Sequence, residues 1–298
     1  MTWTPAAMPD LTGRRAIITG ANGGLGLELA TQLAGHHADV LLACRNTSKA
    51  MAAAETIRRR VPDAAVRVGA LDLADLDCVA TFADAQSGRL DLLVNNAGLM
   101  AIDGSLTAQG FETQFGVNHL GHFALTARLL PLLLATPGSR IGTMSSRGHR
   151  LARGEADPRR YDRWQSYFHS KLANLLFTAE LQRRLAIGGA GTIAVTAHPG
   201  GSNTDLGTEG SGRLNSAMRT VVPYLAQSAE LGARPMLRAL TDPSVRGGEF
   251  YGPRFIIRGA AAVRETPSRA ARDAERARRM WDESVQLTGL EPAVISTP

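Results

Sequence analysis

The sequence predicts one α/β domain, a doubly wound parallel β-sheet with helices on both faces. Short apolar or β-branched runs alternate with longer segments of helical period, as expected when parallel strands are joined by right-handed helical crossovers. No linker-like stretch and no second hydrophobic block divides the 298 residues. We therefore expect one domain over residues 1–298, with its core over about residues 12–260.

The first four predicted strands are short runs that are apolar enough to be covered on both faces. They are Ala16–Thr19, Asp39–Ala43, Val66–Ala70 and Leu90–Val94. Between them, apolar residues recur with helical spacing. This spacing predicts a helix that ends near Leu33 and helices over Thr47–Arg60 and Leu76–Gln86.

The same alternation continues in the second half of the chain. A long helix is predicted across Asn118–Leu134, followed by a strand at Ile141–Met144. A further helix starts near Tyr167 and precedes a strand at Thr192–Ala197. Glu249–Tyr251 is expected to form a short last strand.

A structural helix is predicted over about residues 268–288. Ser268 is suited to cap its first turn, and Glu275 can pair with Arg279 one turn later. Trp281 is expected to anchor this helix to the body of the domain.

Two irregular segments follow strand ends and are expected to line a pocket. Residues 147–166 are rich in Arg, Asp and Gly, and residues 201–222 are rich in Gly, Ser, Asn and Thr. In open α/β sheets, ligands bind outside the carboxyl ends of the strands. We expect the second segment to be a substrate loop.

The net charge of +6 does not indicate a nucleic-acid partner, because the basic residues are scattered. The densest groups, at 58–60 and 269–279, lie in helical segments with interleaved acids and are expected to be solvated helix faces. Basic side chains are almost all Arg: the chain has 31 Arg and only two Lys, Lys49 and Lys171.

The two cysteines, Cys44 and Cys78, have neither a CxxC nor a metal-ligand spacing, which favours a reducing compartment. The N-terminal residues lack the pattern of a signal peptide. The most apolar stretch, residues 129–135, is too short to cross a bilayer. We therefore expect a cytoplasmic protein with no membrane span.

A glycine-rich turn between the first strand and the first helix predicts a dinucleotide site. Glycines allow backbone N–H groups to approach a pyrophosphate, and the helix that follows places its positive dipole end at the anion. The expected contacts are Gly20, Asn22, Gly23, Gly24, Leu25 and Gly26.

The end of the second strand favours NADP(H) over NAD(H). An NAD site usually has an acid here to bind the ribose 2′-hydroxyl, but Cys44 occupies that position and Arg45 follows it. A guanidinium can form charge-assisted hydrogen bonds with a 2′-phosphate. NAD(H) remains an open alternative, since exposed arginines are plentiful in this chain.

The ends of the third and fourth strands supply further candidates for cofactor contacts. Asp72, which Leu73 follows, could reach the adenine amino group or simply end its strand. Asn96, Ala97 and Gly98 would allow a flat ligand to approach closely, or their amides could connect neighbouring loops.

Tyr167 and Lys171 lie four residues apart and therefore share one face of the predicted helix. An ammonium beside a phenol favours the phenolate and lowers the tyrosine pKa. Tyr167 would then donate and accept protons near neutral pH. An isolated Y-x-x-x-K is nevertheless common by chance, so the pair needs support from other motifs.

Together these motifs resemble the short-chain dehydrogenase/reductase family, whose fold is a single Rossmann-type domain. The matching segments are TGANGGLG at 19–26, LDL at 71–73, NNAG at 95–98, Asn118, SS at 145–146, YFHSK at 167–171 and HPGGSNT at 198–204. They occur in the order of the family over about residues 12–205. ACRN at 43–46 and YFHSKLANLLF most resemble the branch of retinol dehydrogenases and protochlorophyllide reductases.

The resemblance implies an oxidoreductase that transfers hydride between NADP(H) and a carbonyl or alcohol. Tyr167 would be the general acid/base, Ser146 would polarise the substrate, and Lys171 would lower the Tyr167 pKa and bind the nicotinamide ribose. Asn118 would hold a water in a proton relay. Pro199, Gly200 and Thr204 would contact the nicotinamide end.

The motifs leave alternatives for the serine and for the reaction. Ser145 is an alternative to Ser146, and the cysteine associated with protochlorophyllide reductases has no counterpart in a matching place. Reduction of a C=C bond on the same scaffold and a non-catalytic dinucleotide-binding regulatory protein are the alternative functions. The expected partner is a small-molecule carbonyl or alcohol, and a homo-oligomer is left open as an alternative to a monomer.

Metal and serine-hydrolase chemistry are not expected. His119 and His122 are three residues apart, but no acid or thiol completes a ligand set, so both are predicted to be satisfied or surface histidines. No G-x-S-x-G surrounds the serine pair.

Overall fold

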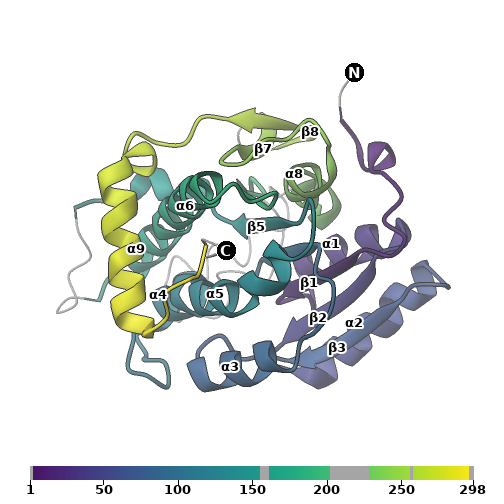
Figure 1. Cartoon of the computed structure of the whole chain (residues 1–298), viewed down its shortest axis with the longest axis horizontal. Coiled ribbons are helices and arrows are strands. Elements are labelled where there is room, and N and C mark those ends of the chain that lie inside the picture. Colours follow the sequence, from purple (N-terminus) through teal and green to yellow (C-terminus); the bar gives the residue numbers. More distant parts are fainter. Residues whose placement is uncertain (1–2, 155–160, 202–227, 256–257, 295–298) are drawn as a thin grey trace.

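An eight-stranded sheet forms the centre of the part of the chain that the structure, a computed structural model, describes: residues 3–154, 161–201, 228–255 and 258–294. The strand order is β3-β2-β1-β4-β5-β6-β7-β8 (Figure 1). The strands are β1 Arg15–Thr19, β2 Asp39–Cys44, β3 Val66–Ala70, β4 Leu92–Asn95, β5 Arg140–Met144, β6 Ile193–Ala197, β7 Phe250–Phe255 and β8 Arg258–Glu265.

The sheet is doubly wound, as predicted. The strands β1 to β7 are parallel, and the chain moves outward from β1 to β3 before it returns to β4 on the other side of β1. This reversal creates a switch point between β1 and β4, where ligands bind in open α/β sheets. One further strand, β8, was not predicted; it pairs antiparallel with β7 at the edge of the otherwise parallel sheet.

Helices cover both faces of the sheet. One hydrophobic cluster packs α1, α2 and α8 on one face, and a second packs α3, α5 and α6 on the other. The helices are α1 Gly24–Gly35, α2 Thr47–Arg60, α3 Leu76–Asp84, α4 Thr113–Phe115, α5 Gly121–Leu134, α6 Arg163–Ile187, α8 Ala229–Thr241 and α9 Ala274–Thr288. Three 3₁₀ turns, at Pro5–Ala7, Arg147–Leu151 and Ala270–Arg272, and a π-helical turn at Gly116–Leu120 complete the described elements.

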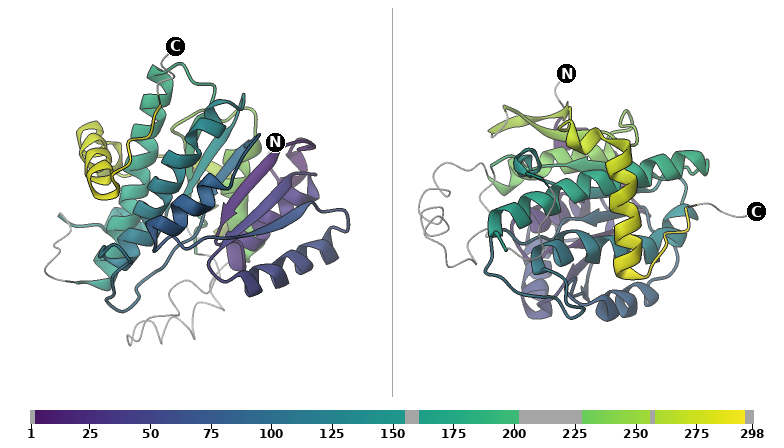
Figure 2. Two further views of the ribbon diagram at one scale, coloured as in Figure 1. Left: turned by 60° about the horizontal axis from the view of Figure 1, so that its bottom comes forward. Right: turned by 90° about the vertical axis from the view of Figure 1, so that its left-hand side faces the viewer.

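The C-terminal helix α9 crosses the outer side of α6 (Figure 2). Trp281 anchors it, as predicted: the indole is buried, stacks on Phe177 and meets Phe123 edge-on. The expected pair of Glu275 and Arg279 is confirmed at 2.6 Å.

The predicted cap of this helix was wrong. Ser268 instead accepts a hydrogen bond from the N–H of Ala271, which lies in the 3₁₀ turn that precedes α9. Asp273 caps α9 itself by accepting from the N–H groups of Glu275 and Arg276. A short turn therefore separates the serine from the helix that it was expected to start.

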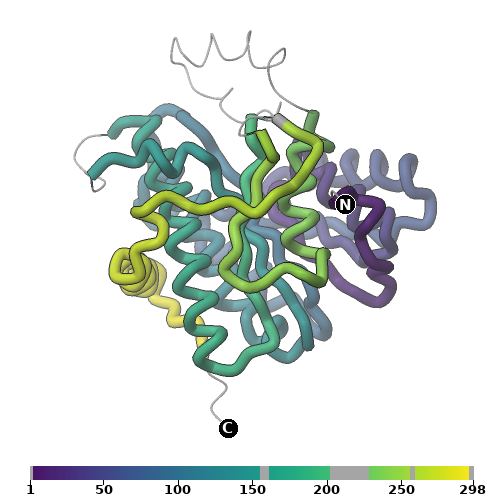
Figure 3. Tube along the Cα trace, turned by 90° about the horizontal axis from the view of Figure 1, so that it is seen from above, coloured from purple at the N-terminus to yellow at the C-terminus, as the bar shows by residue number. Residues whose placement is uncertain are grey.

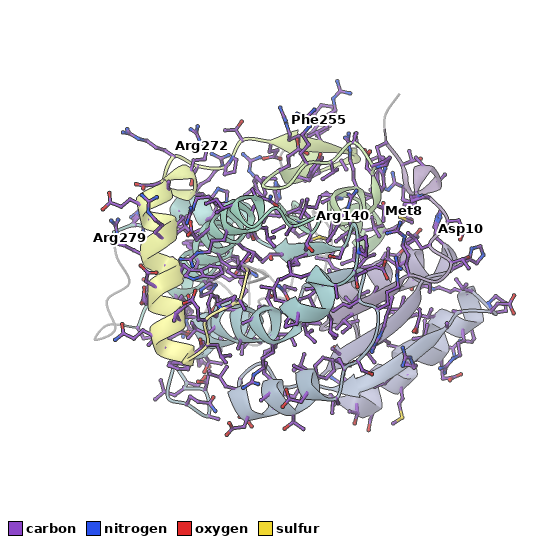
Figure 4. The ribbon with its side chains drawn as sticks, viewed as in Figure 1. Met8, Asp10, Arg140, Phe255, Arg272 and Arg279 are labelled. Atoms are coloured by element: carbon purple, nitrogen blue, oxygen red, sulfur yellow. The ribbon has the colours of Figure 1, made fainter. Side chains whose placement is uncertain are left out.

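The arginine-rich segments lie on the surface, as predicted. Arg58, Arg59 and Arg60 are exposed at the end of α2. Arg272 and Arg279 are also exposed, and Figure 4 shows both along the outer side of the C-terminal helical segment. No helix in the described ranges is both long and apolar enough to span a membrane.

Candidate active site

The glycine-rich turn lies at the carboxyl end of β1 and leads directly into α1. Gly20 and Gly24 have φ values of 64° and 51°, a region that favours glycine. A Cβ at Gly26 would lie 2.5 Å from the Gly20 carbonyl oxygen and 2.7 Å from Asn96 Nδ2. The first turn of α1 therefore packs tightly on the strand ends and leaves its N–H groups at the edge of the sheet.

Thr19, which sequence reasoning treated only as part of a motif, joins three elements. Its Oγ1 accepts hydrogen bonds from the N–H groups of Asn96 and Ala97, both at 2.9 Å. Its hydroxyl donates to His122 Nε2 at 2.8 Å, and His122 Nδ1 donates to the Asn118 carbonyl oxygen at 3.1 Å. His122 is thus a satisfied core histidine, as predicted, and burial lowers its pKa to about 3.

The neighbouring strand ends are connected in the same way. Asn96 Nδ2 donates to the Thr19 carbonyl oxygen at 2.8 Å, so this amide connects loops, which was one of the two predicted roles. Asp72 accepts a hydrogen bond from the N–H of Ala74 at 2.9 Å, and Leu73 is buried. Both features position the loop after β3.

Cys44 ends β2 beside the glycine turn, and Arg45 follows it. Burial raises the pKa of the Cys44 thiol to about 11, although N–H groups of Ala21, Asn22 and Gly20 point at the sulfur and act in the opposite direction. The thiol is therefore neutral at physiological pH. Arg45 is exposed. The position where an acid would bind a ribose hydroxyl carries no negative charge.

Asn118 lies in the π-helical turn between α4 and α5, where a regular α-helix was expected. Its amide Nδ2 donates to the Leu99 carbonyl oxygen and to Ser170 Oγ, both at 2.9 Å. Its Oδ1 accepts from the N–H of Leu99 at 2.7 Å. The side chain is fully buried and joins the loop after β4 to α6. Single π-helical turns are frequent at functional sites.

The two adjacent serines at the end of β5 have different partners. Ser145 is buried, and its hydroxyl donates to the Lys171 carbonyl oxygen at 2.8 Å, which ties β5 to α6. Ser146 hydrogen-bonds with the Tyr167 side chain, and its Oγ accepts from the N–H of Gly148 at 3.0 Å. The structure therefore brings Ser146 to the tyrosine and leaves Ser145 on the backbone of the helix.

Tyr167 and Lys171 lie one turn apart on α6, as the spacing predicts. Both are buried. Lys171 Nζ lies 5.8 Å from the centroid of the Tyr167 ring and 3.4 Å from the Met144 carbonyl oxygen. A Cβ at Gly98 would lie 3.2 Å from both Lys171 Nζ and Asn118 Oδ1, so the loop after β4 passes directly over the lysine.

The expected lowering of the Tyr167 pKa was wrong for this structure. Burial raises that pKa to about 12, and only the hydrogen bond with Ser146 opposes the change. Burial also lowers the pKa of Lys171 to about 8. The ammonium lies over the ring face, and the cost of removing the phenolate from water determines the direction of the shift in the Tyr167 pKa.

The loop after β6 begins with a buried histidine. His198 Nδ1 accepts a hydrogen bond from the N–H of Gly200 at 3.0 Å, and Gly200 has a φ of 69°. Pro199 lies between them. Thr204 and nearly all of the expected substrate loop lie outside the described residues.

Gln114 is a further residue that the sequence motifs missed. Its Oε1 accepts from the N–H of Ala101 at 2.7 Å, and its Nε2 donates to Tyr161 Oη and to the Arg163 carbonyl oxygen, both at 2.9 Å. It thereby joins the loop before α4 to the start of α6. A single glutamine in an irregular segment carries no sequence pattern that would reveal this role.

The site holds polar groups suited to proton transfer and to an anionic cofactor. Among the described side chains, no group of three His, Cys, Asp or Glu residues is placed to bind a metal ion. His119, which is also buried, contacts Ser284 Oγ at 2.8 Å and packs against aromatic rings, so it joins the core to α9.

Comparisons with known proteins agree with this geometry. The sequence model described as short chain dehydrogenase matches residues 14–213. The chain is 39% identical to human retinol dehydrogenase 13, with 97% of this chain and 88% of that protein aligned. It is 37% identical to human retinol dehydrogenase 12, over 94% of this chain and 88% of that protein. A solved structure of an uncharacterized protein from Mycobacterium Paratuberculosis superposes with a TM-score of 0.83 and 43% identity, covering 98% of this chain and 99% of that one.

Proposed function

The chain belongs to the short chain dehydrogenase family and is an oxidoreductase, and we propose that it interconverts a carbonyl compound and its alcohol with NADP(H). Tyr167 would be the general acid/base. The observation that carries this proposal is the convergence of Tyr167, Ser146, Lys171 and Asn118 at the carboxyl ends of β4 and β5. Nothing in a purely regulatory nucleotide-binding site requires that arrangement.

The residues at the end of β1 fit a dinucleotide. The glycine turn brings the first N–H groups of α1 to the sheet edge without side chains in the way, as a pyrophosphate requires. Gly20, Asn22, Gly23, Gly24, Leu25 and Gly26 would form this cradle. Asp72, Leu73, Asn96, Ala97 and Gly98 would border the adenosine and nicotinamide halves, and Pro199, Gly200 and Thr204 would close the nicotinamide end.

The preference for NADP(H) rests on Cys44 and Arg45. A neutral thiol at the end of β2 does not repel a 2′-phosphate, and the adjacent exposed guanidinium can bind it through charge-assisted hydrogen bonds. An aspartate or glutamate in the same place would favour the free ribose of NAD(H).

The chain's own residues can manage the proton. The bound nicotinamide supplies or accepts the hydride. In the reductive direction, Tyr167 Oη donates its proton to the carbonyl oxygen, and Ser146 donates a hydrogen bond to the same oxygen. Lys171 then stabilises the phenolate, and a water near Asn118 returns a proton to it. A tyrosine with a pKa near 12 holds its proton firmly, so the charge of Lys171 is needed when that proton leaves.

We propose candidate substrates from the names of the relatives. The two human relatives reported above are named as retinol dehydrogenases. We therefore include retinal and retinol among the substrates to be tested, together with smaller aldehydes, ketones and enones. Both cysteines are free, which fits the expected cytoplasmic location.

The test combines cofactor binding with turnover. The purified protein is titrated with NADPH and NADH, and its oxidation of NADPH is followed with the carbonyl panel. We expect tighter binding of NADPH, reversed in Arg45→Asp, and a loss of about 10²- to 10⁴-fold in kcat for Tyr167→Phe with nearly unchanged NADPH affinity.

Three results would contradict the proposal. Reduction of enones but not of carbonyls would favour C=C reduction. Binding of NADPH without any turnover, unaffected by Tyr167→Phe, would favour a non-catalytic role. An unchanged ratio of the two cofactor affinities in Arg45→Asp would remove the role given to Arg45.

A further inference from the structure

Glu265, at the end of the edge strand β8, connects the two loops that carry the site. Its Oε1 lies 3.1 Å from His198 Nε2 in the loop after β6, and its Oε2 lies 3.3 Å from a guanidinium nitrogen of Arg147, which follows Ser146. The Glu265 side chain is only 14% exposed, and the His198 side chain is fully buried. Glu265 belongs to no motif that the sequence pattern marks, and His198 is the first residue of the HPGGSNT segment but has no role assigned to it there.

The hydrogen bonds fix the state of His198. Its Nδ1 accepts from the N–H of Gly200 and so carries no proton, and its Nε2 must therefore carry the proton that faces Glu265. Burial alone would raise the pKa of Glu265, but the hydrogen bond with His198 and the charges of Arg147 and Arg150 outweigh it and lower that pKa. The carboxylate thus orients the ring that holds Gly200.

A second histidine holds the other loop to the same segment. His149 Nδ1 donates to the Ser146 carbonyl oxygen at 2.6 Å, and its Nε2 accepts from the N–H of Ser268 at 3.2 Å. The rings of His149 and His198 both pack against Phe250, with centroids 5.7 and 5.2 Å away. Figure 3 shows the yellow-green chain after β8 crossing the molecule towards the C-terminal helix.

Gly252 in β7 leaves the space that this connection occupies. A Cβ at Gly252 would collide with both His198 Nε2 and Glu265 Oε1. Glycine in the interior of a strand weakens it and marks a place where another group approaches closely. The hairpin therefore has no side chain at the position where Glu265 and His198 meet.

We propose that Glu265 is a positioning residue of the oxidoreductase site: through His198 it sets the backbone of Gly200, and through Arg147 it holds the loop that carries Ser146. This role rests on the proposed function, in which the Pro199–Gly200 backbone contacts the nicotinamide end of the cofactor. Glu265 does not touch the reacting atoms. It acts on cofactor affinity and on the alignment of the serine, so its loss affects both kcat and the KM for NADPH.

Glu249, the residue immediately before β7, supplies a matched control next to the same hairpin. Its side chain is also 14% exposed and also pairs with an arginine, Arg264 at 2.9 Å, and it accepts a hydrogen bond from Tyr251 Oη. Among the contacts described for it, none reaches the loops that carry Ser146 and Gly200. Glu249→Gln therefore removes a comparable charge from the hairpin without affecting the site.

The experiment measures NADPH affinity, kcat, KM and thermal midpoint for the full chain and its variants. We expect Glu265→Gln and Gly252→Ala to lower kcat/KM for NADPH by about 10- to 100-fold, because small displacements of positioned groups have effects of that size. We expect Glu249→Gln to stay within about two-fold of the wild type.

A pair of substitutions at His198 separates positioning from simple packing. An asparagine Oδ1 can replace Nδ1 as the acceptor for the Gly200 N–H, whereas a glutamine places its amide near Nε2 and leaves Gly200 without an acceptor. We expect His198→Asn to retain several-fold more activity and NADPH affinity than His198→Gln. This comparison remains valid if Glu265→Gln does not fold.

The outcomes distinguish this inference from the proposed function. A wild-type protein that turns over NADPH, with Glu265→Gln equal to Glu249→Gln in kcat/KM and affinity, overturns the positioning role alone. Equal behaviour of His198→Asn and His198→Gln does the same. A wild-type protein that neither binds NADPH nor turns over overturns the proposed function and the positioning role with it.

Discussion

Burial favours the neutral forms of both Tyr167 and Lys171, because it raises the pKa of the phenol and lowers the pKa of the ammonium. The phenol has a pKa of about 12 and the ammonium a pKa of about 8. Lys171 is therefore largely charged below pH 8 and neutral above it. Since the phenolate left after proton donation needs a nearby positive charge, the proposed reduction should weaken as Lys171 loses its proton.

The first prediction concerns this charge. In the wild type, kcat for carbonyl reduction should fall as the pH rises through about 8, the value to which burial lowers the Lys171 pKa. Lys171→Arg keeps a permanent charge, so the fall near pH 8 should disappear. The kcat of this variant should nevertheless be at least about 10²-fold lower than that of the wild type, because Gly98 and Asn118 leave no room for a larger group.

Rate profiles from pH 6 to 10 check this prediction, with Lys49→Arg as the control. Lys49 is exposed on α2, far from α6 in the fold, and its substitution should not alter the profile. A wild-type rate that is constant through pH 8, or a Lys171→Arg profile that matches the wild type, would contradict the role of the lysine charge.

At the scale of single residues, the sequence predicted which side chains lie together better than it predicted their pKa values. The four-residue spacing placed Tyr167 and Lys171 on one helical face, and the structure confirms that they are neighbours. It could not predict the pKa of Tyr167, because desolvation depends on the segments that cover the phenol. Glu265 was missed for a related reason: its partners come from loops more than 60 residues away in the chain.

The helix α9 is the element whose role is most separable from the chemistry. Trp281 is buried against Phe123 and Phe177, and the Arg184 guanidinium lies 4.4 Å above its ring. These contacts bind α9 to α5 and α6 on the side of the sheet where Tyr167 is found. The helix thereby covers apolar surface that α6 would otherwise expose.

The second prediction is that Trp281→Ala lowers the free energy of unfolding by about 3–5 kcal/mol, the usual cost of emptying a buried aromatic site. Equilibrium denaturation measures this change. Leu287→Ala, on the same helix at a 37% exposed position, should cost about 0.5 kcal/mol or less. Equal losses for the two variants would show that the indole does not anchor α9.

Elements with a clear apolar period were predicted well, and the others were not. The bounds of α2 and β3 agree with the sequence expectation, and those of β1, β2, β5 and β6 differ by one residue at an end. The helix α8 was missed because Gly232 and Pro235 interrupt its pattern, although its buried face packs on β5 and β6. The strand β8 was missed because GAAAV lacks alternation.

Across the whole molecule, the carboxyl ends and the amino ends of the strands have different roles. The carboxyl ends of β1, β4 and β5 carry Thr19, Asn96 and Ser146. At the amino ends of the same strands, Asp91 accepts from the N–H of Arg15 at 2.9 Å, and its carbonyl oxygen accepts from the N–H of Arg140 at 2.7 Å. One residue thus connects the starts of three strands.

The amino end of β5 is also hydrogen-bonded to the end of helix α8. The Arg140 guanidinium, labelled in Figure 4, donates to the carbonyl oxygens of Ala239 and Asp242 at the end of α8, at 3.0 and 2.9 Å. The Asp91 side chain is fully buried and also receives a bidentate contact from Arg89. These groups lie a strand length from the proposed catalytic residues and share no hydrogen bond with them.

The third prediction tests whether the amino ends of the strands contribute to stability without affecting the site at the carboxyl ends. Asp91→Ala leaves the Arg15 N–H without its acceptor and should lower the free energy of unfolding by about 1–3 kcal/mol. Asp84→Ala, which removes a 73% exposed carboxylate, should cost about 1 kcal/mol at most. Below the unfolding transition, kcat/KM of Asp91→Ala should equal that of the wild type, because β1, β4 and β5 remain paired along their length. A fall in kcat/KM without a loss of stability would show that a displacement at the amino ends is transmitted along the strands to Ser146. The two ends of the strands would then not be independent.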